Sequence, residues 1–395
     1  MKGILPIALL GLQDTQGMAQ QPKKFNVAIF LYQGVELLDF AGPAETFSAT
    51  PDFNAYTVSA DGKEILSQGF VTIKPQYPID EAPVPDIVVF PGGNREATSN
   101  NQKVLDWVNS LYSQKVIVMS VCNGAGILAK AGLLNGLVVT THHSFITGLR
   151  KMLPNSTVLD DTKYVDNGNI ITTAGVSSGI DGALHIISRI KGRDVARSVA
   201  YYMEYNKWTP EGGMTIYRNE YIEKWRDEAI GIKLDTGKVS ANAKIPYEGE
   251  LKNLGMELLE KGKYQKTATV MEQAVKWYPY SGSSYSILGK AYLKLGRPAP
   301  IDEDQFVSLI DSGNVDEAVL VYESTRRDFP GWQLFDESTI ASEGNRFLRN
   351  KDYTAAVKVF SLNCQAFPSS RDTWNDLAGA NLKAGNKEAA TPHLP

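Results

Sequence analysis

The chain has 395 residues, of which 43% are hydrophobic, so it is long enough for two or three domains with cores of their own. Its formal net charge is −4 and it has no run of basic residues, which argues against a nucleic-acid partner. The two cysteines, Cys122 and Cys364, are too few for a disulfide scaffold and are expected in different domains.

The first 19 residues are interpreted as a secretory signal peptide. A basic start at Lys2 precedes the apolar run 4–12, and the small residues Gly17 and Ala19 indicate cleavage after Ala19. This run is too short to span a bilayer, and no later segment reaches the roughly 20 apolar residues of a membrane helix, so no stable membrane insertion is expected. The signal predicts a periplasmic or exported protein. If 1–19 is instead an uncleaved tail, a cytoplasmic location is expected.

Residues 24–208 alternate short β-branched runs with helical segments. The predicted strands are 26–32, 55–59, 87–90, 116–121, 138–141 and 170–173. The predicted helices between them are 36–48, 104–114, 124–131, 144–152 and 179–191. Strands that are apolar throughout, such as 116–121, are typical of a sheet that is covered on both faces. We therefore expect an α/β domain with a doubly wound, flavodoxin-like, mostly parallel sheet.

The rest of the chain is predicted to be helical. Residues 209–247 are interpreted as a linker that carries one short amphipathic helix at 217–228. Over 248–395, glycine, aromatic and proline residues recur with a period of about 34 residues, which resembles tetratricopeptide repeats in four or five units. Such repeats form an all-α domain, although a helical domain without repeats is the alternative. The second unit departs from the pattern at Arg297-Pro298-Ala299-Pro300, where its second helix should begin.

Cys122 is the centre of the predicted chemistry. It follows the apolar strand 116–121 and precedes the glycine-rich helix start Asn123-Gly124-Ala125-Gly126, as a nucleophile elbow requires. The turn is tight, so it needs small flanking residues, and the helix N-terminus behind it favours a thiolate. The alternative is a buried cysteine that only contributes to packing.

Two glycines are predicted to lie beside the cysteine. Gly92 and Gly93 follow the strand 87–90 directly and could present backbone N–H groups to a developing oxyanion. Asn123 and Gly124 of the elbow are assigned to the same oxyanion- or substrate-binding role, with the Asn123 N–H as the second donor. The alternative is an ordinary strand-to-helix turn.

A histidine and an aspartate complete the predicted catalytic set. His142 follows the strand 138–141 and could be the base or the hydrogen-bond partner of the thiol, unless it is structural. Asp39 lies in an otherwise apolar helix start and could cap that helix. It could instead face Cys122 and exchange a proton, with a pKa raised by burial.

Taken together, these residues resemble the ThiJ/PfpI superfamily of class I glutamine-amidotransferase-like proteins over residues 24–208. The matching segments are 27–30, 38–43, 91–93, 120–125, 132–136, 140–142 and 175–181. The chain is most similar to the isonitrile-hydratase-like branch and to the amidotransferase-like domain of certain AraC-type regulators. The resemblance implies that Asp39 is the acidic residue, Cys122 the nucleophile and His142 the following histidine, and it suggests a homodimer.

The sequence also departs from these relatives. Asn123 stands where hydratase-like members often carry threonine, and His143 where that branch usually has tryptophan, which leaves isonitrile chemistry open. No second histidine–glutamate pair follows, which argues against ammonia transfer from glutamine. Repeats stand in place of the helix-turn-helix pair of the AraC branch, and together with the acidic charge they argue against DNA contact.

Two classes of function remain. In the first, Cys122 attacks a small-molecule substrate such as an isonitrile, a reactive aldehyde or an amide, so that the protein is a hydratase, a deglycase or glyoxalase, or an amidase. The alternative is a non-catalytic sensor or chaperone-like binding protein with the same fold. In both, the repeats are expected to bind a protein partner. No cofactor or metal is expected, because the pair His142-His143 has no further ligands at a usable spacing.

Overall fold

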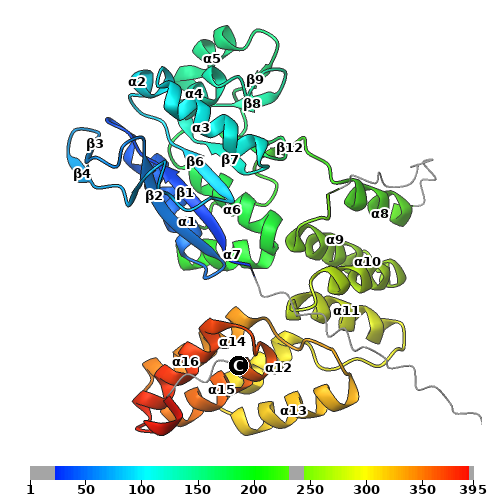
Figure 1. Ribbon diagram of the computed structural model, residues 1–395. Coiled ribbons are helices and arrows are strands. Elements are labelled where there is room, and N and C mark those ends of the chain that lie inside the picture. The colour runs from blue at the N-terminus through cyan, green and yellow to red at the C-terminus, as the bar shows by residue number, and fades with distance from the viewer. Residues whose placement is uncertain (1–22, 231–243, 391–395) are drawn as a thin grey trace, which may run out of the picture.

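The computed structural model describes residues 23–230 and 244–390, which form an α/β domain followed by an array of helices (Figure 1). The predicted signal peptide, residues 231–243 of the predicted linker and the last residues of the predicted repeats lie outside the described residues. No helix within the described ranges combines the length and the apolar character needed to cross a membrane.

A mixed, mostly parallel sheet of eight strands forms the centre of the α/β domain, in the order β12-β10-β11-β7-β6-β1-β2-β5. The strands are β1 (Phe25–Phe30), β2 (Phe53–Ser59), β5 (Tyr77–Pro78), β6 (Ile87–Phe90), β7 (Ile117–Ser120), β10 (Tyr164–Asp166), β11 (Ile170–Thr173) and β12 (Met214–Thr215). Only the pairing of β10 with β11 is antiparallel among the pairs of this sheet. The predicted α/β domain with a mostly parallel sheet is thus confirmed.

Helices cover both faces of this sheet. They are α1 (Leu37–Ser48), α2 (Glu96–Ser99), α3 (Gln102–Ser113), α4 (Ala125–Lys130), α5 (Ile146–Met152), α6 (Ser178–Lys191) and α7 (Arg193–Tyr202). α1 packs against α6, which packs against α7, whereas α3 and α4 contact each other and α3 contacts β7 (Figure 1). Every residue of β6 and β7 is buried between these layers, which explains why the two strands are apolar almost throughout.

Several short elements were not predicted. β3 (Ile65–Ser67) and β4 (Val71–Ile73) form a separate antiparallel hairpin. The predicted strand at 138–141 exists as β8 (Val138–Thr140), but it pairs with β9 (Thr157–Leu159) in a small sheet of its own. β12 lies within the stretch that was expected to be a linker, and its pairing with β10 extends the main sheet there.

The second part of the chain is helical. Its elements are α8 (Glu220–Ile230), α9 (Glu248–Glu260), α10 (Tyr264–Trp277), α11 (Gly282–Lys294), α12 (Glu303–Asp311), α13 (Val315–Asp328), α14 (Glu337–Arg349), α15 (Tyr353–Ala366), α16 (Arg371–Lys383) and a short 3-10 turn at Glu388–Ala390. Residues 297–302, where the sequence departs from the repeat pattern, are not helical because two prolines lie in this stretch.

One contact recurs along this helical array. A glutamate at the first position of a helix accepts a hydrogen bond from a residue 33 positions later, in the pairs Glu248–Ser281 (2.6 Å), Glu303–Asp336 (2.8 Å) and Glu337–Ser370 (2.6 Å). The donor is a serine hydroxyl in the first and third pairs and the backbone N–H in the second. Equal spacing of equivalent contacts is the mark of a repeated structural unit.

The two parts of the chain are joined where α6 ends. The backbone of Gly249 in α9 lies so close to this end that a Cβ there would be 2.4 Å from the Gly192 nitrogen. Asn253 donates to the Ser188 carbonyl (3.1 Å) and accepts from the Arg193 N–H (2.9 Å). α9 therefore packs directly onto the end of α6, which begins at the carboxyl edge of the sheet.

Candidate functional site

Cys122 lies on a strained turn at the carboxyl end of β7. Its φ of 58° falls in the left-handed region, which non-glycine residues rarely adopt. The chain then enters a 3-10 turn, Cys122–Gly124, that leads into α4. Gly124 is required because a Cβ there would lie 2.3 Å from the Phe90 carbonyl oxygen. The sequence thus folds into the expected strand–turn–helix arrangement, with the Cys122 side chain held at the edge of the sheet.

Asp39 lies beside this cysteine and is fully buried. It is not the cap of α1, because the N-cap residue is Glu36 and Asp39 lies in the first turn of the helix. Its Oδ2 accepts the Gly92 N–H instead (2.9 Å), and its Oδ1 is buried without a hydrogen-bond partner in the described residues. A Cβ on Gly92 would lie 2.7 Å from Asp39 Oδ2 and 2.9 Å from Cys122 Cβ, so only glycine lets the two side chains come together here.

The acid and the thiol perturb each other. Burial raises the pKa of Asp39 to about 7, although the hydrogen bond from the Gly92 N–H acts in the opposite direction and lowers it. Burial and then the negative charge of Asp39 raise the pKa of Cys122 to about 12. At neutral pH the carboxyl therefore titrates while the thiol keeps its proton. Once Asp39 is protonated, its charge no longer opposes a thiolate, and it can donate a hydrogen bond to the sulfur.

The glycine amides predicted to form an oxyanion site make hydrogen bonds within the site itself. The Gly92 N–H is held by Asp39, and the Gly93 N–H donates to Asn123 Oδ1 (2.9 Å). Asn123 Nδ2 in turn donates to the Gly93 carbonyl (3.1 Å). The Asn123 side chain therefore clamps the Gly93 peptide, while its backbone N–H acts on Cys122 and lowers the pKa of the thiol.

His142 lies near the site but does not hydrogen-bond to the sulfur. Its Nδ1 is paired with Ser144 Oγ (2.7 Å), and its pKa is lowered by burial and by the neighbouring His143. Its ring lies against Gly175, where a Cβ would be 2.0 Å from His142 Cδ2. His142 is thus in place to support the loop at Gly175 rather than to take a proton from Cys122.

Val176 is a residue that the sequence did not single out. Its φ of 48° is strained, above all for a β-branched side chain. Its backbone N–H interacts with both Cys122 and Asp39 and lowers the pKa of each. The available signal was its place in the segment 175–181, which joins β11 to α6 at the same edge of the sheet.

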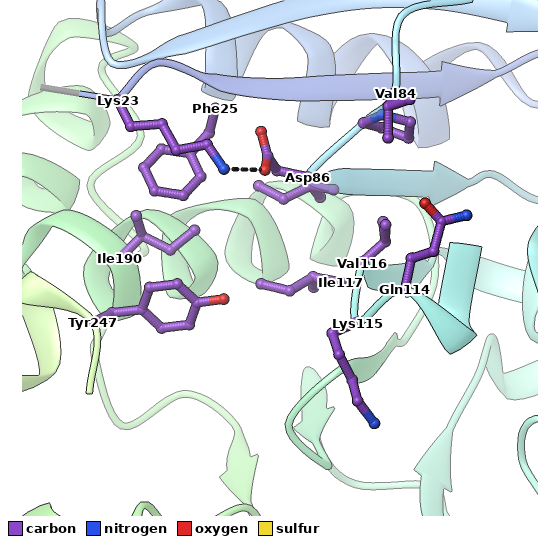
Figure 2. Close-up of a pocket in the computed structure, with 12 residues that line it drawn as sticks. Lys23, Phe25, Val84, Asp86, Gln114, Lys115, Val116, Ile117, Ile190 and Tyr247 are labelled. Atoms are coloured by element: carbon purple, nitrogen blue, oxygen red, sulfur yellow. Dashed lines mark hydrogen bonds and ion pairs between the residues drawn. The ribbon is translucent and has the colours of Figure 1, made fainter. Parts of the chain in front are cut away.

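Other candidate sites are weaker. Cys364 is buried in α15 and donates to the Thr373 carbonyl (3.2 Å), as a core thiol does. Within residues 23–230 and 244–390, no three histidine, cysteine or acidic side chains are placed to hold a metal ion. A cavity of about 220 Å³ lies near the amino ends of β1 and β7, at the opposite edge from Cys122 (Figure 2). Its one carboxylate, Asp86, is already paired with Lys23 (2.5 Å).

The α/β domain has known relatives. The profile of the DJ-1/PfpI family matches residues 25–189. Isonitrile hydratase from Pseudomonas putida is 30% identical over 182 residues, which cover 46% of this chain and 78% of that protein. Protein DJ-1alpha from Drosophila melanogaster is 28% identical over 183 residues, which cover 45% of this chain and 83% of that protein.

Regulators and solved structures are also similar. The HTH-type transcriptional regulator GbdR from Pseudomonas aeruginosa is 25% identical over 164 residues, but only 44% of its length is covered, together with 42% of this chain. The crystal structure of a ThiJ/PfpI family protein from Pseudomonas syringae shares 24% identity at a TM-score of 0.44, over 52% of this chain and 85% of that one.

Proposed function

Because this chain belongs to the DJ-1/PfpI family, we propose that its α/β domain is an enzyme in which Cys122 attacks a small electrophile and Asp39 moves the proton. The observation that carries this proposal is the unpartnered, buried Oδ1 of Asp39 beside a cysteine on a strained turn. A buried carboxyl oxygen without a hydrogen-bond partner lowers the stability of the fold. Such unfavourable groups are concentrated at catalytic sites, which favours a role for Asp39 in the reaction.

Isonitrile hydration is the reaction to test first, since one of the relatives is the isonitrile hydratase of Pseudomonas putida. The Cys122 sulfur would form a bond to the terminal carbon of the isonitrile while that carbon takes a proton through Asp39, which gives a thioimidate. Water would then add to the same carbon, the C–S bond would break, and the thiol would regain its proton. The sum is the addition of one water to the isonitrile, which yields a formamide.

Reactive aldehydes and amides are the other substrates compatible with the site, because the same thiol can add to a carbonyl carbon. The N–H groups of Asn123 and Val176 are the donors that would face the anion formed there, since those of Gly92 and Gly93 are occupied.

The test is turnover of an isonitrile, a glyoxal adduct and an amide by the purified chain, with products identified by mass spectrometry. Cys122→Ala should abolish turnover, and Asp39→Asn should lower kcat by about 10²–10⁴-fold. Cys364→Ala is the matched control, since that thiol lies in α15, and it should retain full activity. Turnover that survives Cys122→Ala would overturn the proposal.

A non-catalytic sensor is the second candidate. It is supported by the pKa of about 12 for Cys122, which keeps the thiol protonated, and by regulators among the relatives. A sensor would bind small molecules without consuming them, so calorimetry on the same panel would give binding without product.

We also propose that the helical array binds a peptide segment of a protein partner that carries both acidic and basic residues. A groove of about 760 Å³ lies between the α/β domain and α14 and α16. Its lining includes the acidic residues Asp336, Glu337 and Asp376 and the basic residues Lys191, Lys252 and Arg371. Charges of both signs favour a polypeptide segment that also carries both signs.

A photo-crosslinker in the groove tests this second proposal. Placed at Asn375, which lines the groove, it should capture a polypeptide, and 0.5 M NaCl should reduce that capture because charged side chains line the groove. Placed at the exposed Leu293 of α11, outside the groove, it should capture none. Equal capture at both positions, or capture that salt does not reduce, would contradict the proposal.

A further inference from the structure

A third pocket, of about 400 Å³, lies next to the candidate nucleophile. Gly93 and Asn123 form its inner wall, and they are the chain neighbours of Gly92 and Cys122. Arg95 and Ser99 line it from the loop and short helix that follow β6, and Lys130 lines it from the end of α4. The pocket is therefore lined by residues that directly follow Gly92 and Cys122 in the chain.

Arg95 is fixed in this pocket by groups that do not neutralise it. Its guanidinium lies over the Phe145 ring, with Cζ 4.2 Å from the ring centroid. It also lies against α4 at Gly126, where a Cβ would be 2.4 Å from Cζ, so the absence of a side chain there makes room for it. Packing against an aromatic face and a glycine orients the planar group without supplying a counter-charge.

The hydrogen bonds of Arg95 are incomplete. Nη1 donates to Ser99 Oγ (3.2 Å), while Nε is buried and has no partner. In the part of the chain that the structure describes, Arg95 forms no ion pair, and burial lowers its pKa. Lys130, at the rim, also has no ion pair within those residues. A half-buried guanidinium that forms no ion pair with the neighbouring Glu96 favours a ligand that supplies a carboxylate.

We propose that Arg95, with Lys130, binds a carboxylate of the substrate, so that the enzyme acts on small electrophiles that carry a carboxylate, such as an isocyano acid. This inference rests on the proposed function of Cys122. A singly charged carboxylate is favoured over a phosphate because Glu96 lines the same pocket and would repel a doubly charged group more strongly.

The first test compares two alkylating agents that differ only in charge. Iodoacetate and iodoacetamide react with the same thiol, and the modification of Cys122 in the full chain is followed by peptide mass spectrometry. We expect the rate ratio of iodoacetate to iodoacetamide to fall about tenfold in Arg95→Gln, with the iodoacetamide rate unchanged. Lys130→Gln should lower the ratio by less, because Lys130 is exposed, and 0.5 M NaCl should weaken the effect of Lys130 most.

Two variants control for folding and for general charge effects. Arg95→Lys keeps the charge and should retain part of the preference for iodoacetate. Arg150→Gln removes an arginine of α5 that is paired with Asp160 (3.2 Å) outside the pocket, and its ratio should equal that of the wild type. A ratio that is the same in the wild type, Arg95→Gln and Arg150→Gln at low salt would overturn the inference.

A second measurement separates this inference from the proposed function. Turnover of isocyanoacetate is compared with that of its neutral ethyl ester, and we expect kcat/KM to favour the acid and to lose that preference in Arg95→Gln. If neither is consumed, the proposed reaction fails while the alkylation ratio still reports the anion site. If both are consumed equally and Arg95→Gln changes neither, the reaction stands and the carboxylate site is refuted.

Discussion

Replacing Asp39 with asparagine should make Cys122 more reactive and at the same time less able to catalyse. An asparagine oxygen can still accept the Gly92 N–H, so the loop that holds the site should keep its place. What the substitution removes is the negative charge beside the sulfur, which is the second largest cause that raises the pKa of Cys122 to about 12. The thiolate should then form at lower pH.

The size of this effect can be bounded. Two unit charges 4 Å apart in an effective dielectric of 20 interact by about 4 kcal/mol, which corresponds to about 3 pKa units. Burial is the largest cause of the shift from 9.0 to about 12, so the charge of Asp39 accounts for only part of that shift. We expect the pKa of Cys122 to fall by roughly one unit, which is about a tenfold gain in thiolate at a fixed pH below the pKa.

The assay is the rate of iodoacetamide alkylation of Cys122 between pH 7 and 10, with Cys364→Ala as the reference background. The rate at pH 8.5 should rise about tenfold in Asp39→Asn, while turnover of any substrate falls. If alkylation instead slows down in the variant, Asp39 acts as a base on the thiol in the absence of substrate. That outcome would refute the prediction that its charge suppresses the thiolate.

Further predictions concern stability and the loops that support the site. Burial raises the pKa of Asp39 from 3.8 to about 7, so the folded state binds this proton more tightly than the unfolded state. The free energy of unfolding therefore falls by up to about 4 kcal/mol as the pH rises from about 4 to 7. Asp39→Asn should accordingly raise Tm at pH 8 and leave it unchanged at pH 3. Gly92→Ala should separate Asp39 from Cys122, cost about 1–3 kcal/mol in denaturant unfolding and abolish turnover. His142→Phe keeps a ring against Gly175 and should preserve the pH profile of Cys122 alkylation. His142→Ala removes that support from the loop that carries the Val176 N–H, so it should shift the profile to higher pH. Equal shifts in the two variants would point to a titrating imidazole. Gly249→Val should split one calorimetric transition into two, because it forces α9 away from α6.

The sheet and the elbow could be predicted because their signals are local. β6 and β7 are buried at every residue, so their sequences are apolar runs that end at Pro91 and Cys122, where the chain turns. Parallel strands place their carboxyl ends at one edge, which brings Asp39 after β1 close to Cys122 after β7, the second of the two alternatives that the sequence left open for Asp39. β5 and β12 were not predicted, because a strand of two residues is too short to show a periodic pattern.

The hydrogen bonding of the site could not be predicted because it depends on side-chain geometry. The sequence does not indicate that the side-chain amide of Asn123 hydrogen-bonds to both the N–H and the carbonyl of Gly93. Valine rarely adopts a positive φ, and the φ of Val176 is 48°. The sequence therefore suggests that Val176 belongs to a strand or a helix, and only the structure shows its place in the loop. α7 is a different case, since its buried face (Ala196, Val199, Ala200) has helical spacing that could have been recognised.

The choice of an acid at position 39 is the strongest argument for chemistry at this site. The hydrogen bond that the Asp39 side chain accepts from the Gly92 N–H could be accepted by an asparagine at lower cost. Such a replacement would also remove a buried charge whose pKa is raised by burial. Packing therefore explains a polar residue at this position but not an ionisable one. What distinguishes aspartate from asparagine is the ability to release and regain a proton, and its free Oδ1 lies where the proton of Cys122 would be exchanged.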